Sequence, residues 1–174
     1  KSEMQFFNGF SNRQKTIIPL FEYLYEKFKI TFYKNFPFMM ENQHEAISIH
    51  VGQCGVQLGD NLWELYCNER YIDPSGKLIY ELNSFNDPFF SEEKSGKYTP
   101  RALFVDLDSE SIDEVRTGRR HNLYNSDQLI SYNEDASKNY ACGYYTTGPH
   151  MIERTLECIR KMANQCSNLE GFMI

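Results

Sequence analysis

Three segments of this chain contain residue types that could bind a phosphorylated ligand. The first is glycine-rich, runs from Gly52 to Gly59 and follows the apolar stretch Ala46–Val51. Glycines let a backbone approach a ligand closely, and a helix that begins there presents unpaired N–H groups to an anion. The segment lacks both the Gly-Lys-Ser/Thr ending of a Walker loop and the G-x-G-x-x-G pattern of dinucleotide-binding folds. Taken alone, it fits either a phosphate site or a tight turn that needs glycine for packing.

The second segment contains two aspartates, Asp106 and Asp108, directly after the apolar run Ala102–Val105. Ligands of open α/β sheets lie beyond the carboxyl ends of the strands. A carboxylate there can hold Mg²⁺ next to nucleotide phosphates. The alternative is that both aspartates only cap the next helix. The third segment, residues 134–139, could surround a phosphate with backbone amides and one lysine, or could be a solvated turn.

The sequence around these segments alternates between short apolar runs and amphipathic stretches. Short apolar runs indicate buried strands of a parallel sheet, and stretches with helical spacing indicate helices that cover it. Strands are expected at Ala46–Val51, Ala102–Val105, Gln128–Ser131 and from Gly171 onward. Helices are expected at Asn61–Glu69, after a Ser111–Glu114 capping box and from Gly148–Pro149. The pattern predicts an α/β fold.

Helical spacing also predicts which side chains of these helices are buried. The expected apolar face of the first helix consists of Leu62, Leu65 and Tyr66. The expected stripe of the last helix consists of Ile152, Leu156, Ile159 and Ala163. The final strand, from Phe172, is short, so we expect it to leave the edge of Ala46–Val51 unpaired.

Composition limits the class of protein. The chain has 174 residues and a formal net charge of -6, which suits one domain and argues against nucleic-acid binding. It has no apolar run of the roughly 20 residues that a membrane span needs. Five cysteines without a C-x-x-C pair favour a reducing compartment such as the cytoplasm, and the four histidines lack zinc-ligand spacing.

Residues 1–39 differ from the rest of the chain and are rich in Phe, Tyr, Lys and Asn. We interpret residues 1–39 as a disordered or non-native extension and residues 40–174 as the domain. The alternative is an amphipathic helix, because apolar residues recur there at helical spacing. These residues are Ile17, Phe21, Leu24 and Phe28.

In this order, the three segments resemble the first three nucleotide loops of alpha-tubulin. They read V-G-Q-C-G-V-Q-L-G from Val51, F-V-D-L-D from Phe104 and E-D-A-S-K-N-Y-A-C-G-Y-Y-T-T-G from Glu134. W-E-L-Y-C from Trp63, D-E-V-R-T-G from Asp113 and I-R-K-M-A-N-Q-C from Ile159 are similar too. The resemblance covers about Glu45 to Ile174.

The resemblance implies a tubulin-like, Rossmann-type parallel sheet flanked by helices, truncated at the start of its fourth strand. It implies that GTP and Mg²⁺ are the cofactors, with Asp108 near the metal. The residues that match GTP-binding positions are Gly52, Gln53, Cys54, Gln57, Asp108, Asp135, Ala136, Ser137, Lys138 and Asn139. Two of them depart from the family, which usually has Glu at the position of Asp108 and Asn at the position of Lys138.

The resemblance further implies pairing with beta-tubulin in microtubules, and hence the cytoplasm and the cytoskeleton as location. Alpha-tubulin holds its GTP as a structural ligand, and this chain ends before the family's G-G-G-T-G-S-G loop and its catalytic acidic residue. We therefore assign no catalytic residue and leave GTPase activity open. The alternatives are a tubulin-like remnant that neither binds GTP nor polymerises and, much less favoured, a dinucleotide-dependent oxidoreductase, which would require G-x-G-x-x-G.

Overall fold

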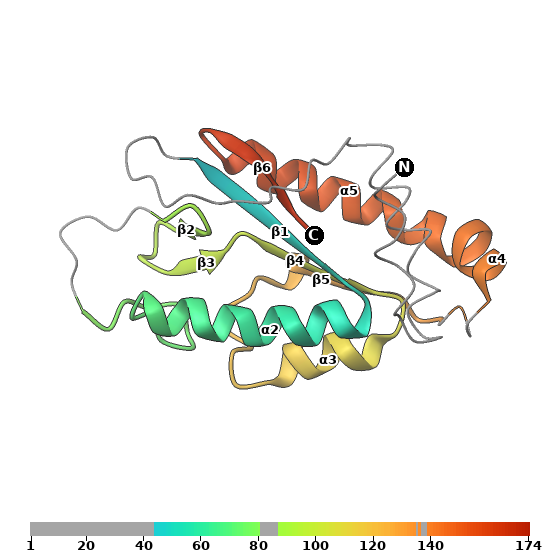
Figure 1. Ribbon diagram of the computed structural model, residues 1–174, viewed down its shortest axis with the longest axis horizontal. Coiled ribbons are helices and arrows are strands. Elements are labelled where there is room, and N and C mark those ends of the chain that lie inside the picture. The colour runs from blue at the N-terminus through green and yellow to red at the C-terminus, as the bar shows by residue number, and fades with distance from the viewer. Residues whose placement is uncertain (1–43, 81–86, 135, 137–138) are drawn as a thin grey trace, which may run out of the picture.

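The computed structural model describes residues 44–80, 87–134, 136 and 139–174. The predictions for residues 1–39, Asp135, Ser137 and Lys138 lie outside the described residues. Within them, four parallel strands form one sheet in the order β5-β4-β1-β6 (Figure 1). These strands are β1 (Glu45–Val51), β4 (Ala102–Asp106), β5 (Leu129–Ser131) and β6 (Leu169–Met173). The predicted α/β class and parallel sheet are confirmed.

Helices cover both faces of this sheet. The helical elements are α2 (Gly52–Glu69), α3 (Ser109–Thr117), the 3-10 turn η2 (Ser126–Gln128), α4 (Tyr140–Cys142), the π-helical turn η3 (Gly143–Thr147) and α5 (Gly148–Gln165). Side chains alternate along a strand, so β4 contributes to two cores. Phe104 packs with residues of α2 and α3, whereas Leu103 and Val105 pack with α5. The sheet is thus the middle layer of three.

The last strand is longer and better paired than the sequence predicts. Ile47 of β1 is in register with Phe172 of β6, and Ser48 with Met173. On its other side β1 pairs with β4. The expected unpaired edge of β1 is therefore wrong for Glu45–Ser48, which pair with β6, so β1 is an interior strand and β6 is the outer one.

The first helix differs from the prediction in both its start and its buried face. It begins at Gly52 instead of Asn61, because Gly52 adopts a positive φ of 73° that turns the chain directly from strand into helix. The side chains that face the core belong to Val56, Trp63 and Cys67. Of the predicted face, Leu65 is 52% exposed and wrongly placed, whereas Tyr66 is partly buried and packs against the core.

The last helix, α5, starts at Gly148 as predicted, and α4 and the π-helical turn η3 lead straight into it. Its buried side chains are Met151, Thr155, Cys158, Ile159 and Met162, so only Ile159 of the predicted stripe is buried. Thr155 and Cys158 can be buried although they carry polar groups, because each donates a hydrogen bond to a backbone carbonyl. Thr155 Oγ1 lies 2.8 Å from the oxygen of Met151, and Cys158 Sγ lies 3.2 Å from that of Asp127.

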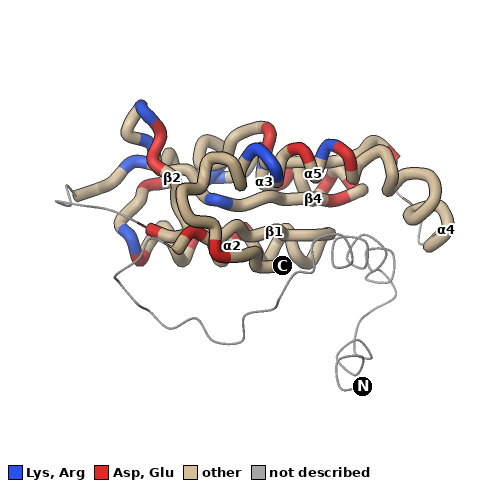
Figure 2. The backbone as a smooth tube through the Cα atoms, turned by 90° about the horizontal axis from the view of Figure 1, so that it is seen from above, with Lys and Arg blue, Asp and Glu red and all other residues tan. Residues whose placement is uncertain are grey.

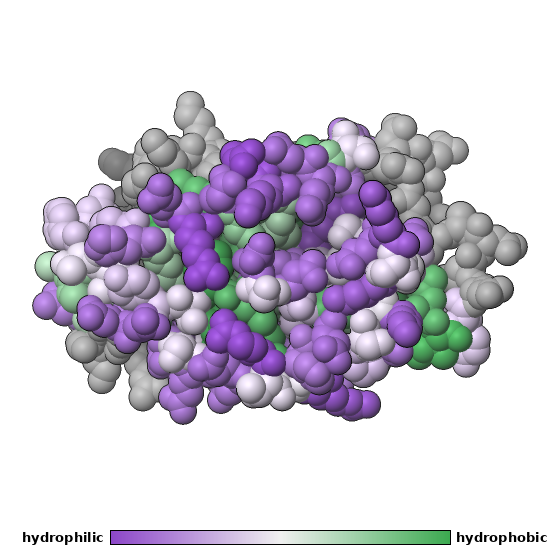
Figure 3. Space-filling model, turned by 180° about the vertical axis from the view of Figure 1, so that it is seen from behind, coloured by the Kyte–Doolittle hydropathy of each residue, from purple (hydrophilic) through white to green (hydrophobic). Residues whose placement is uncertain are grey.

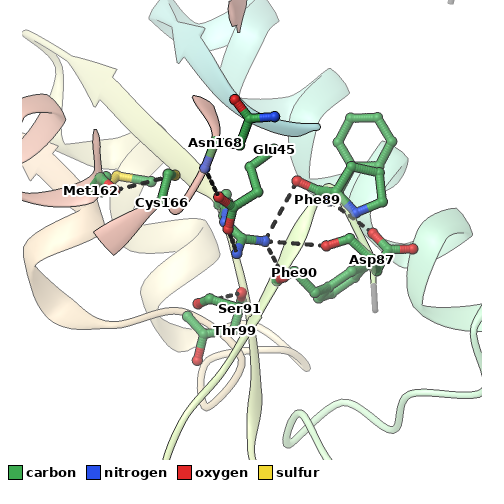
Figure 4. Close-up of polar contacts among 11 residues, drawn as sticks. Glu45, Asp87, Phe89, Phe90, Ser91, Thr99, Met162, Cys166 and Asn168 are labelled. Atoms are coloured by element: carbon green, nitrogen blue, oxygen red, sulfur yellow. Dashed lines mark hydrogen bonds and ion pairs between the residues drawn. The ribbon is translucent and has the colours of Figure 1, made fainter. Parts of the chain in front are cut away.

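A small antiparallel hairpin, β2 (Phe90–Glu92) and β3 (Tyr98–Pro100), precedes β4. It is joined to the start of the sheet by Arg101, which donates to the carboxylate of Glu45 and to the carbonyl of Phe90 (Figure 4). The other oxygen of Glu45 accepts from the backbone N–H of Asn168, at 2.8 Å. The buried ion pair between Arg101 and Glu45 therefore links the first residues of β1, β4 and β6.

The surface of the described chain is mixed in charge and mostly polar. Figure 2 shows acidic and basic positions interspersed along the helices and the β2–β3 hairpin. The face seen in Figure 3 is largely hydrophilic, with apolar residues in small separate areas. Among the described residues, no helix combines the length and the apolar character that crossing a membrane requires.

Candidate functional site

The three segments singled out in the sequence begin at one edge of the sheet. Strands β5, β4 and β1 are neighbours and run parallel, so their carboxyl ends lie side by side. The chain leaves β1 into α2, β4 into Leu107 and Asp108, and β5 into the segment that leads to α4. This edge is where ligands bind in open α/β sheets.

The amino-terminal end of α2 is suited to an anion. Its capping residue, Val51, makes no side-chain hydrogen bond to the helix, and the first turn contains no acidic residue. The first four N–H groups of a helix have no partner within it, and the helix dipole adds partial positive charge there. Gln53 and Cys54 have exposed side chains in this turn. The turn therefore offers backbone donors to a ligand from solvent.

The other two helices at this edge already have side-chain caps. Asp108 accepts from the backbone N–H of Glu110 at 3.0 Å, and Asn139 accepts from that of Ala141 at 3.0 Å. The expected Ser111–Glu114 capping box is wrong, because α3 begins at Ser109 and Asp108 occupies its cap. Of these three helices, α2 is the one whose capping residue makes no side-chain hydrogen bond to the helix.

The two aspartates after β4 have different environments. Asp106 is buried, and its oxygens accept from Ser111 Oγ at 2.5 Å and from the N–H of Asp108 at 3.2 Å. Burial raises the pKa of Asp106 above its ordinary value, although these hydrogen bonds oppose the shift. Asp108 is exposed and uses one oxygen as a cap. Of the two, Asp108 has the carboxylate oxygen that a ligand could reach.

The remaining predicted residues are placed as follows. Gln57 is exposed, and its Nε2 lies 3.4 Å from Glu114 Oε2 on α3. Ala136 is buried, and its carbonyl accepts from the N–H of Asn139 at 2.8 Å. The predicted helix cap at Asp108 is confirmed, whereas its role near a metal stays a prediction.

This edge of the sheet offers backbone donors at the end of α2 and one exposed carboxylate, that of Asp108. The described part of the chain has no group of three or more His, Cys, Asp or Glu side chains that could hold a metal ion. Mg²⁺ is commonly bound by one or two carboxylates together with substrate phosphates and waters. Asp108 could supply one such carboxylate once phosphates occupy the end of α2.

One residue that supports this edge, His50, was not predicted from the sequence. His50, next to the last residue of β1, accepts a hydrogen bond at Nε2 from Trp63 Nε1, at 3.0 Å. The only sequence signal is the spacing of Gly55 and Gly59, which places two side-chain-free positions on one face of α2.

Comparison with known proteins gives a family match and similar curated proteins. The model of the Tubulin/FtsZ family, GTPase domain, matches residues 45–174. The curated protein "Tubulin alpha chain, nucleomorph" of Guillardia theta is 51% identical over 135 residues, which are 75% of this chain and 30% of that protein. The chain thus spans under a third of the length of this relative.

Proposed function

This chain belongs to the Tubulin/FtsZ family, and from this premise we propose that it is the GTP-binding part of an alpha-tubulin-like subunit that pairs with beta-tubulin in microtubules. The observation that carries the proposal is the uncapped amino-terminal end of α2 at the carboxyl edge of the sheet. It lies beside the reachable carboxylate of Asp108. The similarity to an alpha chain selects the kind of subunit.

In this proposal the backbone amides of Gly52, Gln53 and Cys54 bind the phosphates of GTP. The side chains of Gln53 and Gln57, both exposed, extend from the same helix and complete the contacts to the nucleotide. Asn139 and the residues before it bind on the β5 side. When bound, Mg²⁺ would neutralise phosphate charge, and Asp108 would hold it directly or through water.

The proposed role of the nucleotide is structural. The carboxylates at this edge are either bonded within the protein, as in Asp106, or engaged as a cap, as in Asp108. Neither is placed as a general base in the described residues. GTP would act as an ordered, multiply charged ligand that holds the three segments together and presents them to the beta subunit.

A chimaera tests the proposal in an intact subunit. Residues 45–174 replace the matching segment of the Guillardia theta alpha chain, and the product is co-expressed with beta-tubulin. We expect a heterodimer that releases one GTP per alpha site on denaturation, in addition to the nucleotide of the beta site. The parent alpha chain, treated identically, is the control.

Two results would overturn the proposal in different ways. A heterodimer without the second nucleotide would show that this edge does not bind GTP. No heterodimer, although the parent forms one, would favour the alternative of a tubulin-like remnant that neither binds GTP nor polymerises.

A further inference from the structure

The imidazole of His50 joins three elements directly beneath the proposed phosphate site. Its Nε2 accepts from Trp63 Nε1, on the third turn of α2, at 3.0 Å. Its ring stacks on Phe104 of β4 at a centroid distance of 4.8 Å and an interplanar angle of 27°. His50 itself belongs to β1, in register with Phe104. The side chain therefore connects β1 to the neighbouring strand β4 and to the helix that follows β1.

A glycine on α2, Gly59, makes room for this imidazole. A Cβ atom on Gly59 would lie 2.5 Å from both Cγ and Nδ1 of His50, which is closer than real Cβ atoms approach. A Cβ on Gly55 would lie 3.4 Å from the backbone carbon of His50. We call this space the Gly59 notch. The helix crosses the end of β1 at a distance that only glycine permits.

The hydrogen bond also defines the state of the ring. Because Nε2 accepts from Trp63, the proton of the neutral imidazole is on Nδ1. Burial lowers the pKa of His50 to about 4, so the ring stays neutral at ordinary pH. The contacts of His50 described here are with Gly55, Gly59, Trp63 and Phe104, none of which titrates.

Two fixed points determine the direction of a rigid helix. Chain continuity fixes α2 at Gly52, and the notch fixes it at Gly59, about 10 Å further along at 1.5 Å per residue. The hydrogen bond to Trp63 fixes its rotation, because the indole must keep facing β1. Any change at the notch therefore alters the direction in which the amides of the first turn point.

We propose that His50 is a positioning residue for the nucleotide site, whose imidazole in the Gly59 notch sets the direction and rotation of α2 and so aims the amides of Gly52–Cys54. That these amides point toward phosphate rests on the proposed function. The positioning of α2 by His50 does not, and it can be measured without nucleotide.

The test measures amide hydrogen exchange in the full 174-residue chain without nucleotide. Val56 and Gln57 carry N–H groups that bond within the helix just after the first turn of α2, and Asp113–Val115 of α3 serve as internal reference. His50→Leu removes the acceptor, and His50→Gln restores an acceptor near the position of Nε2. Cys67→Ala is the matched control, since it removes buried volume from the far end of the same helix.

With His50→Leu we expect exchange at Val56 and Gln57 to rise at least about tenfold relative to α3, the effect of losing one buried hydrogen bond locally. His50→Gln should return that ratio to near its parent value, and Cys67→Ala should not change it. If His50→Leu does not fold, Trp63→Phe replaces it, because it removes the donor and keeps the imidazole.

The proposal is overturned if His50→Leu, or Trp63→Phe in its place, changes exchange in α2 and α3 by the same factor. It is also overturned if His50→Gln behaves like His50→Leu. GTP retention by the chimaeric heterodimer with the same substitutions is a separate measurement. If the parent chimaera retains no GTP, the proposed function fails, whereas the exchange ratio still decides the role of His50.

Discussion

The ion pair between Arg101 and Glu45 gives the sharpest prediction about what holds this sheet together. The side chains are only 12% and 10% exposed, so this is a buried pair. Removing one partner of such a pair leaves an uncompensated charge and costs about 3–5 kcal/mol. Arg101 also donates to three backbone carbonyls, including that of Pro88 at 3.5 Å. Arg101→Met should therefore fall at the upper end of this range.

The assay is urea unfolding followed by fluorescence. Trp63 is the single tryptophan and is fully buried, so its emission reports on the loss of the core. With a slope of about 2 kcal/mol per molar urea, a loss of about 5 kcal/mol lowers the midpoint by about 2.5 M. The midpoint should fall while the slope stays unchanged.

Two controls decide whether burial is the cause. Arg160 and Glu157 form an ion pair with two hydrogen bonds, at 2.7 and 2.8 Å, on the exposed face of α5. Arg160→Met should leave the midpoint unchanged, because solvent screens an exposed pair. The double variant Arg101→Met/Glu45→Leu should lose less than Arg101→Met alone, since it leaves no buried charge. A loss below about 1 kcal/mol for Arg101→Met, the value typical of surface pairs, would refute the reasoning.

Three further predictions concern pH, the cap of α3 and the amino-terminal residues. Since the pKa of His50 is lowered from 6.5 to about 4, the unfolded state takes up a proton first as the pH falls. The stability that the neutral His50 contributes is complete above about pH 6.5 and is lost toward pH 4. From pH 7.5 to 5.5 the free energy of unfolding measured with urea should fall by about 1 kcal/mol from this cause, and His50→Gln should lack this part of the pH dependence. Asp108→Ala should cost about 1 kcal/mol by removing the cap. Asp108→Asn should keep the cap but lose GTP from the chimaera more readily as Mg²⁺ is removed with a chelator. If GTP retention depends on the Mg²⁺ concentration in the same way with Asn and with Asp, Asp108 has no role near the metal. Deleting residues 1–39 should leave the unfolding midpoint of the remaining chain unchanged, and a clear loss would show that they contribute to the fold.

Much of the fold was predictable because it depends on local pattern. The apolar run Ala102–Val105 indicates a buried strand, and the polar residues after it mark the carboxyl edge of the sheet. Since parallel strands end together, the site could be placed before the strand order was known. The short strand from Phe172 was misjudged, because pairing with β1 depends on a register that no local pattern contains.

The errors concern contacts between distant residues. Arg101 and Glu45 are 56 positions apart, and nothing in either neighbourhood indicates their pairing. Leu65 is more hydrophobic than Gly59, yet the glycine faces the core because His50 needs the space. Asp108 and Ser111 are both good capping residues, and the burial of Ser111 against Asp106 decided between them.

Nucleotide retention by two variants of Cys54 tests the central claim most directly. Cys54 is exposed in the uncapped first turn of α2, so either substitution fits there. Cys54→Asp places a negative charge where phosphates are proposed to bind, although that charge favours the helix itself. Cys54→Asn is its neutral match. In the chimaeric heterodimer we predict that Cys54→Asp weakens GTP binding at the alpha site at least about tenfold relative to Cys54→Asn, while the fold is equally stable or more so. Equal GTP retention by the two variants would contradict the account.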